Sequence, residues 1–234
     1  MKTIARTIIL VFFCSLLHNC SSAQINGNSS PELFVQFKEL FHEIDLPINW
    51  NCLDIGKLSM PSWGPKGIYY EIPSDFFSFL PDELLESDSI TYIRALFQLP
   101  PKNGVLLFVI ATDYQYDRYR TGVLYTILTQ IYLLGYDSSG KLLFNKFIAG
   151  NHVDKWDKLL TFNSDYKFET RYYEFLGGTM THPTKKHLVG LRKHTKTTCE
   201  ITKEGIVNCS SNTIIGYFEY SHGDYELVKI YEDN

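Results

Sequence analysis

The chain has 234 residues, of which 44% are hydrophobic and 21% charged, and its formal net charge is −4. This length and composition suffice for a globular domain with its own core. A mildly acidic chain lacks the basic surface that nucleic acid binding requires, so we exclude nucleic acid as a partner. Sixteen Tyr and sixteen Phe against three Met favour strands, on whose pleated surface aromatic side chains pack well.

The N-terminus has the pattern of an export signal. Lys2 and Arg6 precede an apolar run from Ile8 to Leu17. A run of this length is too short to span a bilayer as a helix, and it matches the hydrophobic region of a signal peptide. No later stretch is long and apolar enough to be a transmembrane helix. The sequence therefore predicts that the chain is exported.

Two kinds of cleavage fit the residues that follow. The small residues Ser21 to Ala23 suit ordinary signal peptidase. Alternatively, Leu17-His18-Asn19-Cys20 resembles the lipobox of bacterial lipoproteins, in which the Cys becomes the lipidated N-terminus. We keep both expectations: a lipoprotein lipidated at Cys20 and anchored to a membrane, or a freely secreted protein.

The predicted organisation has three parts. Residues 1–19 are the expected signal peptide and residues 20–30 a flexible tether of small and polar residues. Residues 31–234 are expected to form a single β-rich domain with an N-terminal amphipathic helix.

The helix is predicted to begin at Pro31, because Ser30 can cap it and proline suits the first helical position. Its apolar residues recur at spacings of three and four as far as Ile44, and it is expected to end before Pro47. Residues 49–67 are expected to form a loop. A short strand follows at Ile68–Ile72, then brief helical segments after Ser74 and from Pro81 to about Glu86.

Beyond Ile90 the pattern is typical of strands. Val105–Ala111 is continuously apolar, so it is expected to be covered on both faces. The turn Asp137–Gly140 predicts a hairpin between the strands Thr129–Tyr136 and Lys141–Ala149. Tyr166–Tyr172 is expected to form a half-exposed strand, and Ile214–Tyr220 and Tyr225–Tyr231 a final hairpin. The predicted fold is mainly β with an N-terminal helix, an antiparallel meander forming an open barrel or a sandwich.

A disulfide is predicted between Cys199 and Cys209. If Gly205 lies in the left-handed conformation of a three-residue hairpin loop, the register places these two cysteines opposite each other. Export supplies the oxidising environment in which the bond persists. The alternative is a pair of free, buried cysteines. Cys52 is left without a partner and is expected to be a buried thiol.

One segment is a candidate for ligand recognition. A segment expected between two strands contains three tyrosines and two arginines within seven residues: Tyr114, Tyr116, Arg118, Tyr119 and Arg120. Amphipathic aromatic side chains are enriched at binding surfaces, so this segment could stack on a sugar or a peptide. The alternative is that an aromatic-rich domain places some tyrosines in its loops.

Two further groups of polar residues have competing interpretations. His182, His187 and His194 lie among lysines, which favours an edge strand protected from aggregation, or a contact for phosphate-bearing lipid or anionic glycan, over a metal site. Four aspartates are expected in turns, where they have no spacing of a known calcium loop: Asp113, Asp117, Asp154 and Asp157.

Catalytic motifs were sought without success. The S-x-x-K pattern occurs at Ser138–Lys141 and Ser164–Lys167, but both copies fall at expected strand turns and not at a helix start. No catalytic residue, metal ligand or cofactor is predicted.

The order of parts resembles that of a family of exported bacterial lipoproteins to which we can assign no activity. The resemblance lies in the lipobox-like start, the segment Asp45–Asn49 that ends the first helix, and the hairpin segment Tyr132–Leu142. It implies a membrane-anchored lipoprotein of the outer membrane or periplasm, or alternatively a secreted protein.

The leading functional expectation is a non-enzymatic binding or assembly module at the cell envelope. Its expected partners are the membrane, through the lipid anchor, and a glycan or protein ligand. The alternatives are a secreted hydrolase whose site is assembled from scattered residues and a carrier of a small apolar ligand. A pocket with convergent acids or histidines would favour the hydrolase, and an internal cavity lined by Phe and Tyr would favour the carrier.

Overall fold

The computed structural model of the protein describes residues 30–59, 70–86, 90–117, 125–152, 155–202, 205 and 207–232. The predicted signal peptide and almost all of the tether, including Cys20, lie outside the described residues. No helix in the described part of the chain has both the length and the apolar character needed to cross a membrane.

Helix α2 (Pro31–Lys38) begins as predicted, because the Ser30 hydroxyl accepts a hydrogen bond of 3.1 Å from the Leu33 N–H. The expectation that it continues to Ile44 is wrong. After Lys38 the chain tightens into a turn, and strand β1 (His42–Glu43) pairs in parallel with strand β4 (Ile90–Lys102). The backbone of this segment thus bonds to the sheet in place of continuing its own helix.

The expectation of a loop over residues 49–67 is also wrong for its first part. Strand β2 (Ile48–Trp50) is followed by helix α3 (Cys52–Ser59), and residues 60–67 lie outside the described residues. Asn51 Oδ1 accepts hydrogen bonds from the N–H groups of Leu53 and Asp54, at 2.8 and 3.0 Å. Asp54 in turn accepts from the Asn51 N–H at 3.3 Å, which completes a capping box.

The short elements before the main sheet agree with the sequence. Strand β3 (Tyr70–Glu71) lies within the predicted strand, and the 3₁₀ helix η1 (Ser74–Phe79) and helix α4 (Asp82–Leu85) occupy the two predicted helical segments. Ser74 is the first residue of η1, and Pro73 precedes it without a side-chain cap.

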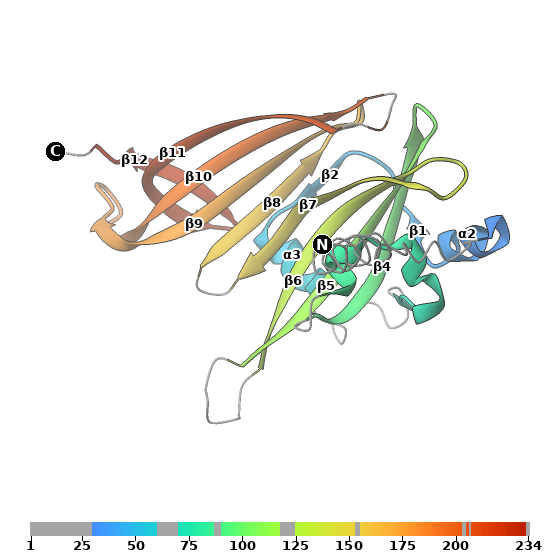
Figure 1. Cartoon of the computed structure of the whole chain (residues 1–234). Helices are drawn as coiled ribbons and strands as arrows, with labels where there is room; N and C mark the ends of the chain where they lie inside the picture. Colours follow the sequence, from blue (N-terminus) through green and yellow to red (C-terminus); the bar gives the residue numbers. More distant parts are fainter. Residues whose placement is uncertain are drawn as a thin grey trace, which may run out of the picture.

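The fold is mainly β, as predicted, and consecutive strands from β4 to β12 pair as an antiparallel meander (Figure 1). The sheet is not closed. Strand β3 pairs with β4, and β2 pairs with β8. The meander consists of β4 (Ile90–Lys102), β5 (Val105–Asp117), β6 (Tyr125–Tyr136), β7 (Leu142–His152), β8 (Trp156–Phe162), β9 (Lys167–Thr181), β10 (Leu188–Ile201), β11 (Val207–Ser221) and β12 (Asp224–Ile230).

Two hydrophobic clusters lie on opposite faces of the first strands, so β5 is covered on both faces as predicted. Phe108 and Ile110 join the phenylalanines of α2 and η1 in one cluster, whereas Leu107 and Val109 belong to the other. Full burial of a large apolar side chain contributes roughly 1.5–3 kcal/mol to stability. This two-sided burial explains why the strand is continuously apolar.

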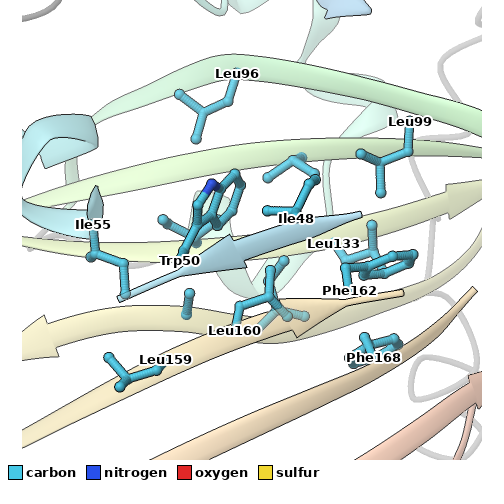
Figure 2. Close-up of a cluster of buried hydrophobic side chains, with 14 of the residues drawn as sticks. Ile48, Trp50, Ile55, Leu96, Leu99, Leu133, Leu159, Leu160, Phe162 and Phe168 are labelled. Carbon is cyan, nitrogen blue, oxygen red and sulfur yellow. The ribbon is translucent and has the colours of Figure 1, made fainter. Parts of the chain in front are cut away.

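The cluster that contains Leu107 and Val109 fills the space between the two halves of the bent sheet. Figure 2 shows Ile48 and Trp50 of β2 between the strand that carries Leu99 and the strands that carry Phe162 and Phe168. Strand β2 can enter here because β7 and β8 pair only near the turn that joins them. Beyond that point the end of β8 pairs with β2.

Candidate ligand-binding site

The predicted disulfide between Cys199 and Cys209 is present. The two residues are directly opposed in the β10–β11 hairpin, with their Cα atoms 4.2 Å apart, and Gly205 has the expected positive φ of 72°. Cys199 is buried, and Cys209 is exposed. The bond closes the hairpin at the end of the sheet, and it is a structural feature.

The candidate recognition segment does not form the expected loop over its first part. Tyr114 and Tyr116 lie within β5, opposite Leu128 and Thr126 of β6. Arg118, Tyr119 and Arg120 lie outside the described residues. A binding role for this segment stays a prediction.

The three histidines do not form one group. His182 and His187 stack at the β9–β10 turn, with ring centroids 5.2 Å apart, and both approach the Glu219 carboxylate. His194 instead stacks on Tyr173, 4.5 Å between centroids. Strand β10 lies between β9 and β11, so the edge-strand interpretation is wrong. Among the described residues, no group of three or more His, Cys, Asp or Glu is placed to hold a metal ion.

Three of the four aspartates expected in turns, Asp113, Asp117 and Asp157, lie in strands, and Asp154 lies outside the described residues. Asp113 is buried in β5, where its carboxylate receives hydrogen bonds from the Arg94 side chain at 2.6 and 3.0 Å and from the Thr129 hydroxyl at 2.7 Å. Arg94 also donates to the Leu58 carbonyl at 2.8 Å, which links helix α3 to the sheet. This group is therefore part of the core. Asp157 lies in β8, in the region described next.

Strand β12 folds back over the sheet until its first residues contact β8 and β9; Figure 1 shows the curl of these last strands. The Arg171 guanidinium donates to both oxygens of the Asp224 carboxylate, at 3.0 and 2.8 Å. The Tyr225 hydroxyl donates to the Asp157 carboxylate. The Cys52 N–H donates to the Gly223 carbonyl at 2.9 Å. The β11–β12 turn is thus fixed against the start of α3.

The interior of this curl holds titratable groups whose charged forms are disfavoured. Burial raises the pKa of Tyr173 to about 12 and lowers that of His194. Burial, with the nearby Asp157 and Asp224 carboxylates, raises the pKa of the Cys52 thiol to about 12. Cys52 is a half-buried free thiol, and at neutral pH it is protonated and poorly suited to act as a nucleophile.

A pocket of about 290 Å³ opens where β12 meets β8 and β10. Arg192 of β10 is held between two aromatic rings, its Cζ 4.6 Å from the Tyr225 centroid and 5.3 Å from that of Phe175. Burial raises the pKa of Asp157. The lining combines charged and aromatic side chains: His152, Lys155, Trp156, Asp157, Phe175, Arg192 and Tyr225.

A bulge in β9 places the aromatic partner of Arg192. Between the pairs Thr179–Gly190 and Phe175–Arg192, β9 has three residues, 176–178, whereas β10 has only Leu191. Gly177 and Gly178 in this bulge have positive φ values of 80° and 92°. The pairing resumes with Phe175 opposite Arg192. Such bulges bend a strand and re-aim its side chains. The two consecutive glycines are the sequence signal for this irregularity, which was not among the predicted features.

The pocket adjoins a row of half-buried aromatic residues that crosses four strands. Tyr132, Phe147, Trp156 and Tyr172 follow one another with ring centroids 5.6, 5.6 and 5.8 Å apart. Lys158 lies over the Phe147 ring and donates to the Phe147 carbonyl at 2.8 Å. Burial, and secondarily the Lys146 charge, lowers the pKa of Lys158 to about 8. Trp156 belongs both to this row and to the pocket.

We compared the chain with models of protein families, with curated protein sequences and with solved structures, and no match was found in any of the three. The resemblance to exported lipoproteins therefore stays a prediction from the sequence.

Proposed function

We propose that this protein is an exported, lipid-anchored binding module of the cell envelope that holds a small ligand in the pocket between β8, β10 and β12. The observation that carries the proposal is the lining of that pocket. Arg192 stands there between two rings, beside the Lys155 and Asp157 side chains. Small-molecule sites commonly combine aromatic walls with a few placed polar groups.

The same lining favours binding over the two alternatives. A carrier of an apolar ligand would line its cavity with apolar side chains, whereas three charged residues border this one. A hydrolase would need an activated nucleophile with a base in reach. The nearby thiol of Cys52 is held protonated, and Asp157 already accepts a hydrogen bond from Tyr225.

The sequence supports both export and anchoring, and the disulfide supports export. A disulfide such as Cys199–Cys209 persists in an oxidising compartment and is rare where thiols are kept reduced. The lipobox-like segment places Cys20 directly after the apolar run. A lipid on Cys20 and the short tether would hold the domain at the membrane surface, where the acyl chains supply the affinity.

Anchoring is tested by growing cells that make the full-length protein with an alkyne-bearing fatty acid and then detecting the label on the purified protein. The expected result is labelling of the wild type and of the Cys14→Ala variant, and no labelling of Cys20→Ala. Cys14 is the matched control because it lies within the predicted signal peptide. Labelling of Cys20→Ala, or none of the wild type, would refute the anchor.

Binding is tested through the fluorescence of Trp156, which lines the pocket, whereas Trp50 is buried in the core. Purified protein is titrated with soluble oligosaccharide fractions released from the envelope. We expect a saturable change in emission that is lost in the Trp156→Phe variant. Absence of any saturable change, or its persistence in that variant, would refute the proposed site.

A further inference from the structure

We propose that the pocket binds a small sugar acid, a hydroxylated ring bearing one carboxylate, with the carboxylate on the Arg192 guanidinium. This inference rests on the proposed binding function and names the class of ligand. It depends on one arginine whose donors are unused, on the balance of charge around it, and on the aromatic rings beside it.

The three arginines that the structure describes differ in their partners. Arg94 and Arg171 each donate two hydrogen bonds to a carboxylate, of Asp113 and Asp224 respectively. Within the described part of the chain, Arg192 makes no hydrogen bond, and its Nε is buried without a partner. Leaving the donors of a buried group without a hydrogen-bond partner costs free energy. The planar guanidinium can donate two parallel hydrogen bonds to a carboxylate, so a carboxylate is a suitable partner for Arg192.

The charge around Arg192 favours an anion. Lys155 adds a second positive charge, and Asp157 is the one carboxylate in the lining. Asp157 forms no ion pair with Arg192 among the described contacts, although the two charges attract each other, and it accepts a hydrogen bond from Tyr225. A carboxylate entering the pocket would therefore meet two cations and give Arg192 the partner that the fold does not supply.

The rest of the lining suits a hydroxylated ring. Trp156 offers aromatic surface to the apolar face of a sugar, and Asp157 offers an acceptor for its hydroxyl groups. The volume of about 290 Å³ lies near the lower limit of ligand pockets, which fits a single ring. An amino acid fits less well, because its ammonium group would be repelled by two cations, Lys155 and Arg192, against the attraction of one carboxylate, Asp157.

The test is isothermal titration of the full-length purified protein in detergent with glucuronate, glucose and phenylalanine. We expect glucuronate to bind at least about tenfold more tightly than glucose, the loss expected from one charge-assisted hydrogen bond. The Arg192→Gln variant should lose this preference. Lys193→Gln is the matched control, because Lys193 is the next residue of β10, points to the opposite face and pairs with Glu174.

The outcomes separate this inference from the proposed function. Equal binding of glucose and glucuronate, or tighter binding of phenylalanine, would overturn the sugar-acid inference and leave the binding function standing. A preference for glucuronate that survives in Arg192→Gln would also overturn it. Should Arg192→Gln fail to fold, the comparison of the three ligands on the wild type still decides. Absence of binding by every ligand in this panel would overturn the sugar-acid inference, and no response to envelope fractions in addition would refute the proposed function as well.

Discussion

Removal of the disulfide tests both the stability of the last strands and the argument for export. Substituting Cys199→Ala and Cys209→Ala together removes the bond and leaves no lone thiol in the hairpin. The two residues are separated by 10 positions. By the chain-entropy relation, closing a loop of this size stabilises the folded state by about 3 kcal/mol at 25 °C. We therefore expect the double variant to lose about that much free energy of unfolding.

The loss is measured by urea unfolding followed by circular dichroism, with and without dithiothreitol. Reductant should lower the free energy of unfolding of the wild type towards that of the double variant and leave the variant unchanged. Cys52→Ala is the control, because Cys52 is outside the bond and its variant should still respond to reductant.

A difference below about 1 kcal/mol between oxidised wild type and double variant would refute the reasoning. So would an equal effect of dithiothreitol on both proteins. The same assay bears on the compartment. Protein recovered after export should carry the bond, and recovery of exported protein with free Cys199 and Cys209 thiols would contradict the oxidising location.

Three further predictions concern polar groups in the sheet. Arg94→Met removes the cationic partner of the buried Asp113 carboxylate and should cost about 3–5 kcal/mol in urea unfolding. Tyr225→Phe removes the donor to Asp157 and should cost about 1–3 kcal/mol in the same assay. Lys158 has a folded pKa of about 8, below its unfolded value, so between pH 8 and 10 the unfolded chain binds more protons. The free energy of unfolding of the wild type should therefore rise by about 2–3 kcal/mol across this range relative to Lys158→Met.

Each of these predictions has a matched comparison. Lys167→Met breaks an exposed pair with Asp165 and should cost no more than about 1 kcal/mol, so a loss equal to that of Arg94→Met would contradict the burial argument. Tyr217→Phe should leave stability nearly unchanged, and a larger loss than in Tyr225→Phe would count against the Asp157 contact. For Lys158, parallel pH profiles of wild type and variant would show that burial does not perturb the amine.

Much of the fold followed from local patterns in the sequence. The start of α2 needed only Ser30 and Pro31, and the disulfide followed from a hairpin register fixed by Gly205. These features depend on neighbouring residues, whose spacing determines what they contact. The end of α2 did not follow, because His42–Glu43 pairs with a strand more than fifty positions away. A tertiary partner there overrides the local helical pattern.

The candidate site was beyond the reach of these patterns. Arg192, Asp157 and Tyr225 come from three strands that meet only because β12 folds back over the sheet. In the sequence Arg192 is one of several cations near the histidines, and nothing local separates it from a solvated surface charge. Helix α3 was missed although the pair Asn51 and Asp54 forms its capping box, since a short helix with Gly56 inside shows little periodicity.

The central claim is that the pocket between β8, β10 and β12 holds a ligand. The most direct measurement is the NMR spectrum of protein labelled with ¹⁵N at the tryptophan indoles, recorded during titration with glucuronate. We expect the Trp156 signal, assigned from the Trp156→Phe variant, to shift and saturate, and the signal of the core residue Trp50 to stay in place. A Trp156 signal that does not move under conditions where calorimetry detects bound glucuronate would contradict this claim.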